Sequence, residues 1–146
     1  MADRRAIEAM FARCSFESRY ARFLAPVAAF PADQLARGLS SAPGHEAWLA
    51  TPRSGPETVV ALGSWARVGT GAEVALLVED SWQRRGIGTA LLDVLVAEAR
   101  DGGVCQLTAA VLSESRHVLR MLRRAATRTS TNAEGVLSEI LMDVCA

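Results

Sequence analysis

In the first part of the chain, apolar side chains recur every three to four residues, which predicts helices there. Ser15 is a favourable N-cap for the second helix, and Pro26 is expected to end it. Pro31 and Gly38 stand where a third, shorter helix would begin and end. The expected helices span residues 4–14, 15–25 and 31–39.

After residue 44 the pattern changes to short apolar runs separated by turn residues, which is typical of strands. The three strands before Gly86 are expected to pair antiparallel, and Glu73 lies on the third of them, just before its apolar run of residues 74–78. The expected strands span residues 45–50, 57–68, 74–78, 104–112, 128–131 and 135–144, and the remaining helices begin at Thr89 and at Glu114. The pattern therefore predicts an α/β fold with a mixed, mostly antiparallel sheet flanked by helices.

The turn Gln83–Gly88, between the third strand and the next helix, has the features of an anion-binding loop. Gly86 and Gly88 lack a Cβ atom, so the backbone can turn sharply there and approach a ligand closely. The first N–H groups of the following helix have no partner within it, and the helix dipole favours negative charge at that end. Arg84 and Arg85 add two cations. The turn therefore predicts a site for a pyrophosphate.

Two common phosphate-binding motifs do not fit this turn. A Walker A loop needs a lysine after its last glycine, but Thr89 follows Gly88 and the chain contains no lysine. A Rossmann fingerprint needs a third small residue where Leu91 stands, and an acidic residue after the next strand. Neither a nucleoside triphosphate nor a dinucleotide is therefore favoured.

The composition suits one globular domain over residues 1–146, because half of the 146 residues are apolar. Sixteen arginines balance sixteen acidic residues, so there is no large basic surface for nucleic acid. Residues 24–32 form the longest apolar candidate for a signal peptide, but Pro26 and Pro31 interrupt them, and no segment is long enough to span a membrane. A cytoplasmic protein that binds neither nucleic acid nor membrane is expected.

The cysteines, Cys14, Cys105 and Cys145, are odd in number and widely spaced. This pattern argues against a disulfide framework and against a zinc site, so reduced thiols and no bound metal are expected. Cys105 lies in an apolar strand and is expected in the core. His45 and His117 are isolated and are expected at the surface or at a helix end.

The turn is similar to motif A of the GNAT superfamily of N-acetyltransferases, Q/R-x-x-G-x-G/A, which Gln83–Gly88 reproduces without a gap. The resemblance extends as an order of elements over residues 58–144. Residues 72–75 and 13–23 resemble segments of bacterial protein-lysine acetyltransferases of the Pat type, the second of them the helix S-P-E-S-x-Y-x-R-F. The first strand of a GNAT domain appears nowhere in this sequence, which implies an exposed sheet edge or a partner strand.

The resemblance implies acetyl-CoA as the acyl donor, with its pyrophosphate on the turn and its pantetheine arm along the backbone of the preceding strand. Ser115 stands where the family often has an asparagine that contacts the cofactor. It is equally suited to cap the following helix, and the two roles are compatible. The expected cofactor-binding residues are Leu76, Leu77, Val78, Gln83, Arg84, Arg85, Gly86, Ile87, Gly88, Thr89 and Ser115.

Glu73 is the candidate general base, because an ammonium group must lose a proton before it can attack a thioester. The resemblance of residues 72–75 places its carboxylate near the acyl group, where partial burial would raise its pKa. A solvated glutamate at a strand start is the alternative reading. Glu79 and Asp80 are expected to be solvated loop charges, and no tyrosine after Tyr20 is available as a general acid.

The expected activity is acetyl transfer to a primary amine, with a protein lysine as the favoured acceptor. Two alternatives remain open at this stage. The acceptor could be a small amine, because the residues do not define the acceptor groove. The chain could also bind acyl-CoA as a sensor without turnover, because Ser115, Val118 and the missing first strand depart from the family pattern. The resemblance allows a homodimer, although no interface can be inferred.

Overall fold

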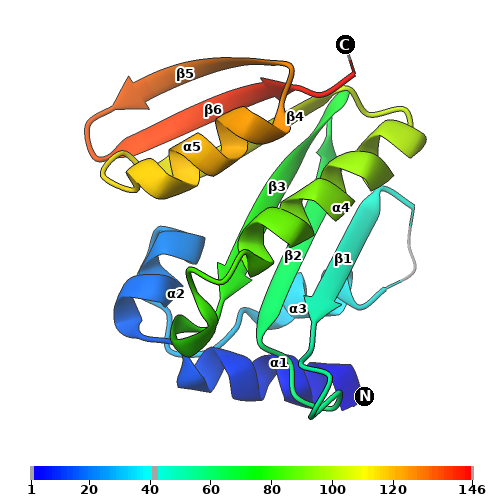
Figure 1. Cartoon of the computed structure of the whole chain (residues 1–146), viewed down its shortest axis with the longest axis vertical. Coiled ribbons are helices and arrows are strands. Elements are labelled where there is room, and N and C mark those ends of the chain that lie inside the picture. Colours follow the sequence, from blue (N-terminus) through cyan, green and yellow to red (C-terminus); the bar gives the residue numbers. More distant parts are fainter. Residues whose placement is uncertain (1, 41–42, 146) are drawn as a thin grey trace.

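The computed structural model of the chain describes residues 2–40 and 43–145 and shows a mixed sheet with helices on both faces (Figure 1). Its elements are α1 (Ala2–Arg13), α2 (Phe16–Phe23), α3 (Ala32–Gly38), β1 (His45–Ala50), β2 (Ala61–Val68), β3 (Gly71–Val78), the 3-10 turn η1 (Asp80–Trp82), α4 (Ile87–Asp101), β4 (Gln106–Leu112), α5 (Arg116–Ala125), β5 (Arg128–Glu134) and β6 (Leu137–Asp143). The predicted fold class is confirmed.

Within residues 2–40 and 43–145, six strands follow the order β1-β2-β3-β4-β6-β5, and β3 with β4 is the only parallel pair. These two strands pair only at Ala72↔Leu107 and Glu73↔Thr108. Beyond Glu73, β3 continues to Val78 and β4 continues to Leu112 without pairing to each other. The sheet therefore opens into a wedge at the carboxyl ends of β3 and β4.

Two clusters of buried residues form the core, one on each face of the sheet. The first contains Leu92 and Leu95 of α4, and the second contains Ile7 and Phe11 of α1. Gly63 of β2 lies directly under α4, since a Cβ atom built there would come within 2.9 Å of the Leu95 side chain. The missing side chain at this glycine thus lets α4 pack closely on the sheet.

Most expected boundaries agree with the structure, and the first three strands pair antiparallel as predicted. The prediction for β2 was wrong at its start, because residues 57–60 form a turn and a short extended link rather than ladder pairs. The prediction for β5 was too short, since the strand reaches Glu134 and turns at Gly135, whose φ is 63°. No described strand precedes α1, and β1 forms one edge of the sheet.

The prediction of reduced cysteines was wrong for two of them, since Cys105 and Cys145 form a disulfide across 40 residues of sequence. Antiparallel pairing of β4 with β6 brings these residues together, because Cys105 directly precedes Gln106, Cys145 lies two residues after Asp143, and Gln106 pairs with Asp143. Cys105 is also exposed rather than in the core. Cys14 is free and buried, and burial, followed by the charges of Asp80 and Glu79, raises its pKa to about 11.

None of the helices formed by residues 2–40 and 43–145 is long and apolar enough to cross a membrane.

Candidate active site

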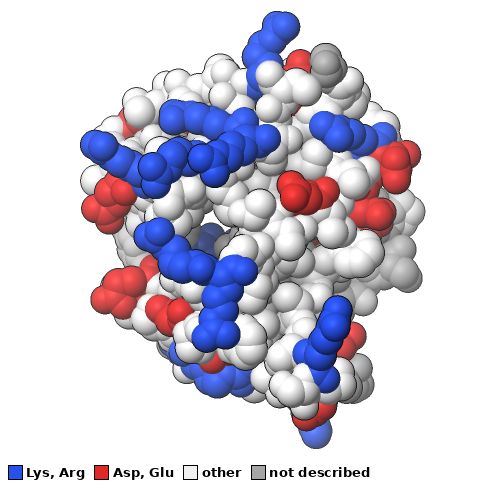
Figure 2. Space-filling model, viewed as in Figure 1, with Lys and Arg blue, Asp and Glu red and all other residues white. Residues whose placement is uncertain are grey.

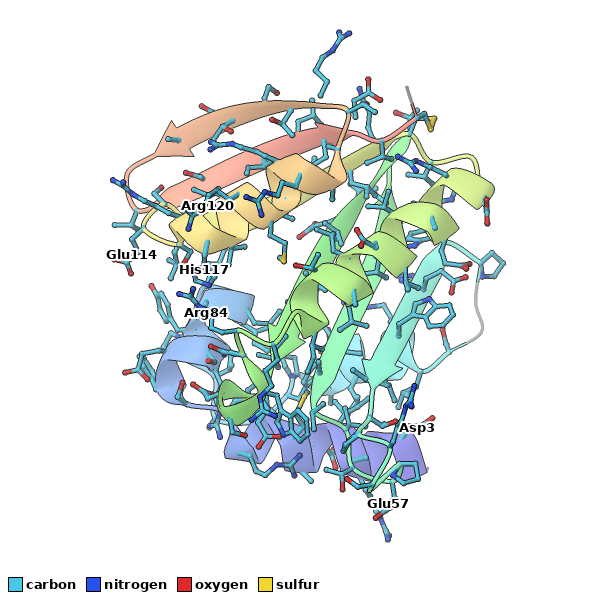
Figure 3. All side chains as sticks on the ribbon, in the orientation of Figure 1. Asp3, Glu57, Arg84, Glu114, His117 and Arg120 are labelled. Carbon is cyan, nitrogen blue, oxygen red and sulfur yellow. A yellow bond between two sulfur atoms is a disulfide. The ribbon has the colours of Figure 1, made fainter. Side chains whose placement is uncertain are left out.

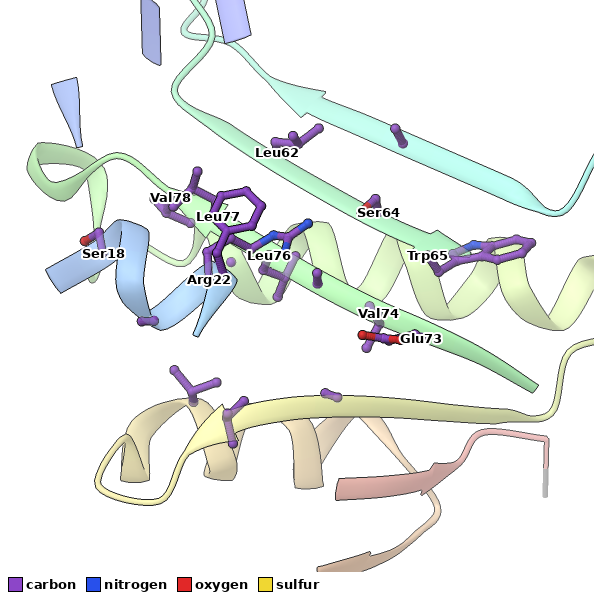
Figure 4. Close-up of a pocket in the computed structure, with 18 of the residues that line it drawn as sticks. Ser18, Arg22, Leu62, Ser64, Trp65, Glu73, Val74, Leu76, Leu77 and Val78 are labelled. Atoms are coloured by element: carbon purple, nitrogen blue, oxygen red, sulfur yellow. The ribbon is translucent and has the colours of Figure 1, made fainter. Parts of the chain in front are cut away.

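A cavity of about 1330 Å³ lies at the wedge between β3 and β4 and extends over the face of the sheet that α2 covers (Figure 4). Of the residues expected in the site, all except Arg85 line this cavity. They are Glu73, Leu76, Leu77, Val78, Gln83, Arg84, Gly86, Ile87, Gly88, Thr89 and Ser115. The structure thus brings the expected base and the expected phosphate loop to the walls of one cavity.

The loop before α4 presents free backbone donors to this cavity. Gly86 is the N-cap of α4 with φ 83°, a conformation that glycine adopts without strain. The first hydrogen bond of the helix runs from Ala90 N–H to Gly86 C=O, at 3.0 Å. Among the described residues, no group accepts from the N–H groups of residues 87–89. These donors and the helix dipole fit a phosphate group.

Cations lie around the loop (Figures 2 and 3). In Figure 2, arginine side chains lie on both sides of a hollow between α5 and the start of α4. Arg85 stacks on the Trp82 ring at 4.8 Å, so Trp82 holds an arginine beside the loop. His117 of α5 lies near Arg84 and Arg120 (Figure 3), and burial, followed by these two charges, lowers its pKa. His117 is exposed in the first turn of α5, so the prediction of a histidine at the surface or at a helix end is confirmed.

Asp80 connects the loop before α4 to the start of α2. The sequence predicted a solvated loop charge at this position, but the carboxylate is hydrogen-bonded within the protein. Its carboxylate accepts from Ser15 N–H at 2.8 Å, Ser15 Oγ at 2.7 Å and Ser18 Oγ at 3.0 Å. Burial raises the pKa of Asp80, but these hydrogen bonds outweigh it, so the pKa lies below its usual range. Gln83 Nε2 donates to Ser18 Oγ and to Val78 C=O. Ser15, the N-cap of α2, and Ser18, in its first turn, therefore hold the loop before α4 in place.

Glu79 also departs from the expectation of a solvated charge. It is buried, with 8% of its surface exposed, and its carboxylate pairs with Arg13 of α1 at 3.1 Å. Arg13 also donates to Val59 C=O at 2.8 Å. Because Arg13 and Glu79 are distant in sequence, spacing along the chain could not reveal this ion pair.

Glu73 lies on the wall of the cavity and points to the face of β3 that α2 covers, together with Ala75 and Leu77. Its side chain is exposed rather than partly buried, and it makes no hydrogen bond or ion pair among the described residues. Beyond Glu73, the edge of β3 facing β4 has no strand partner. A ligand in the wedge can therefore reach both the free carboxylate and the backbone of residues 76–78.

Ser115 occupies the N-cap position of α5, where its carbonyl accepts from Leu119 N–H at 3.1 Å. Its side chain makes no capping hydrogen bond. The hydroxyl group is thus available to a ligand in the cavity that it lines. Within the described part of the chain, no group of three or more His, Cys, Asp or Glu residues could hold a metal ion.

A parallel strand pair that separates and an anion-binding helix start at the opening are features that fit an N-acetyltransferase that uses acyl-CoA. The chain belongs to the acetyltransferase (GNAT) family, whose profile matches residues 7–126. No curated protein is significantly similar to it in sequence.

The structure is similar to the GNAT domain of S. lividans PAT, with 26% identity, a TM-score of 0.85, and coverage of 97% of this chain and 85% of that one. It is also similar to a cAMP-binding acyltransferase from Mycobacterium smegmatis, with 29% identity and a TM-score of 0.61 over 89% of this chain. The match spans only 40% of that protein. The ribosomal-protein-S18-alanine N-acetyltransferase from Escherichia coli shares the fold at 17% identity, with a TM-score of 0.69 over 99% of this chain and 89% of that one.

Proposed function

We propose that this protein transfers an acetyl group from acetyl-CoA to the amine of a protein lysine, with Glu73 as the general base. The observation that carries the proposal is the position of Glu73, a free carboxylate that lines the same cavity as the loop before α4. The sequence resemblance to protein-lysine acetyltransferases and the similarity to S. lividans PAT support a lysine acceptor.

The residues of the cavity fit acetyl-CoA. The unbonded N–H groups of residues 87–89, with Arg84 and Arg85 nearby, suit the pyrophosphate. The unpaired edge of β3 offers the backbone groups of Leu76 to the pantetheine arm, since those of Leu77 point to β2. The Gln83 side chain already donates a hydrogen bond to Val78 C=O. We therefore propose that Gln83 binds the cofactor through its backbone and that its side chain stabilises the loop.

The bound thioester supplies an activated acetyl group, and the protein has to provide an unprotonated amine beside it. We assign Glu73 to take a proton from the acceptor ammonium, directly or through a water molecule, so that the nitrogen lone pair is free to attack. A backbone N–H of β3 can stabilise the negative charge that develops on the carbonyl oxygen. The carbon–sulfur bond then breaks, the nitrogen passes its surplus proton to the departing thiolate or to solvent, and the thiolate can leave without a general acid because a thiol has a pKa of about 8.5.

The test measures thiol release from acetyl-CoA with a panel of lysine peptides and small primary amines, and acetyl-CoA binding by calorimetry. The Glu73→Gln variant should lower kcat by about 100-fold or more while acetyl-CoA binding is kept. Glu114→Gln is the matched control, because Glu114 is exposed and lines the same cavity. Thiol release by Glu73→Gln at the wild-type rate would refute the assignment of the base. Faster transfer to small amines than to peptides would identify the alternative acceptor class.

A further inference from the structure

Arg22, at the end of α2, is an arginine in the cavity that the proposed reaction does not use. It lines the cavity. Its side chain extends from α2 across β3 toward Ser64 and Glu73 (Figure 4). It is half-buried, stacks on the Phe23 ring at 4.5 Å, and makes no hydrogen bond or ion pair among the described residues.

Two neighbouring arginines have structural roles, and their contacts differ from those of Arg22. Arg13 pairs with Glu79 and donates to a backbone carbonyl. Arg19 donates to the carbonyls of Phe11 and Ala12, at 3.0 and 3.1 Å, and stacks on the Phe11 ring. Both guanidinium groups are satisfied within the protein. That of Arg22 is not, although a half-buried charge without partners is costly.

The floor between Arg22 and Glu73 is lined by small side chains. Ser64 and Ala66 of β2 are the register partners of Ala75 and Glu73 of β3, so all four lie on the face that α2 covers. Glu73 and Arg22 influence each other electrostatically but form no ion pair. A ligand with one positive and one negative group can therefore lie between them.

Building on the proposed function, we propose that Arg22 binds a carboxylate of the acceptor, so that the enzyme prefers amines that carry an acidic group near the amine. A guanidinium group offers a planar pair of N–H donors that matches a carboxylate. The carboxylate would anchor at Arg22 while the ammonium group faces Glu73. Its source is either the carboxyl group of a free amino acid or an acidic residue next to a lysine in a protein.

The experiment compares kcat/KM for matched pairs of acceptors with wild-type enzyme and acetyl-CoA. One arm uses 4-aminobutyrate, 5-aminopentanoate and 6-aminohexanoate against their amides, and the length series reports the spacing between the two groups. The other arm uses peptides with Asp-Lys against Asn-Lys. The wild type should prefer the carboxylate member by about 10- to 100-fold in at least one arm, as expected for a charge-assisted hydrogen bond. The preferred arm identifies the source.

Arg22→Gln should bring the ratio of kcat/KM between carboxylate and amide acceptors close to one, mainly through KM. Arg22→Lys should keep part of this preference, because lysine retains the positive charge but lacks the planar pair of N–H donors. Butanoate should compete with the preferred acceptor in the wild type but not in Arg22→Gln. Arg37→Gln is the matched control, since exposed Arg37 lines the same cavity but pairs with Asp33 at 3.9 Å. It should keep the wild-type ratio.

Three results would overturn this inference alone. They are equal rates for carboxylate and amide acceptors in the wild type, loss of the preference in Arg37→Gln rather than Arg22→Gln, and an equal drop in kcat for all acceptors in Arg22→Gln. The last would mean that Arg22 acts on Glu73 or on the thioester. If the wild type transfers acetyl to no amine in either arm, the proposed function fails together with the inference.

Discussion

Replacing Asp80 by alanine should destabilise the protein, because its carboxylate is the junction between α2 and the phosphate loop. The change removes three hydrogen bonds, from Ser15 N–H, Ser15 Oγ and Ser18 Oγ, of 2.7 to 3.0 Å. Asp80 is exposed, so each bond is taken at the low end of the usual range, about 0.5 kcal/mol. The loss in unfolding free energy is then about 1.5 kcal/mol, or about 3–6 °C in Tm for a chain of this length.

The loss of stability caused by Asp80→Ala should depend on pH in a direction that the lowered pKa of Asp80 determines. The carboxylate is the form that the hydrogen bonds stabilise, and the pKa of Asp80 in the folded protein is lowered. Its contribution should therefore be complete above the unfolded pKa of about 3.9 and should disappear as the pH falls through the lower, folded value. The gap between wild type and Asp80→Ala should accordingly be constant between about pH 5 and 8 and should shrink below about pH 4.

Urea unfolding followed by circular dichroism at pH 7, 5, 4 and 2.5 measures this gap. Asp93→Ala is the control, because Asp93 is exposed on α4 and makes no hydrogen bond or ion pair among the described residues. It should cause no loss of stability. The reasoning would be refuted if Asp80→Ala unfolded at the wild-type urea concentration at pH 7, or if the gap stayed the same at pH 2.5.

Three further changes test other parts of the structure. The pKa of His117 is lowered in the free protein, and a bound phosphate nearby would raise it, so acetyl-CoA should bind with proton uptake and more tightly at pH 6 than at pH 8. His117→Gln should weaken this rise in affinity, which calorimetry at both pH values measures. Gly86→Ala should cost about 1–2 kcal/mol in urea unfolding, because φ there is 83°, whereas Gly55→Ala should cost less, because no positive φ is found there. Cys145→Ser should lower the unfolding free energy by about 2–4 kcal/mol through loss of the link to Cys105, and reduction of the wild type should have the same effect.

The sequence predicted the fold well where local patterns decide the structure. The bounds of β1 were predicted correctly, and the helix after the turn Gln83–Gly88 was expected from Thr89, two residues after its observed start at Ile87. Both depend on turn residues and on spacing within one element. The start of β2 was placed too early because Val59 and Val60 are apolar and buried yet lie outside the ladder. Burial alone does not show whether a residue pairs with a neighbouring strand.

The parts of the site that were missed depend on contacts between distant segments. The charge on Glu79 looked solvated because its partner, Arg13, lies on α1 at the beginning of the chain. The disulfide between Cys105 and Cys145 was hidden for the same reason, since only the pairing of β4 with β6 brings the two together. The segment of residues 13–23 resembles a helix of Pat-type acetyltransferases, but its sequence alone does not reveal that Ser15 and Ser18 bond to Asp80 and Gln83.

Through that contact, α2 connects the loop proposed to bind the cofactor with Arg22, the residue proposed to bind the acceptor. Its first turn holds the phosphate loop through Ser15 and Ser18, and its last turn carries Arg22 over the cavity. The helix has only eight residues, about 12 Å at 1.5 Å per residue. Because one short, rigid helix positions both, a shift of its N-terminus also moves Arg22 relative to Glu73. In the proposed reaction, Ser15 and Ser18 would therefore influence the position of the acceptor as well as that of the cofactor, without contact to either substrate.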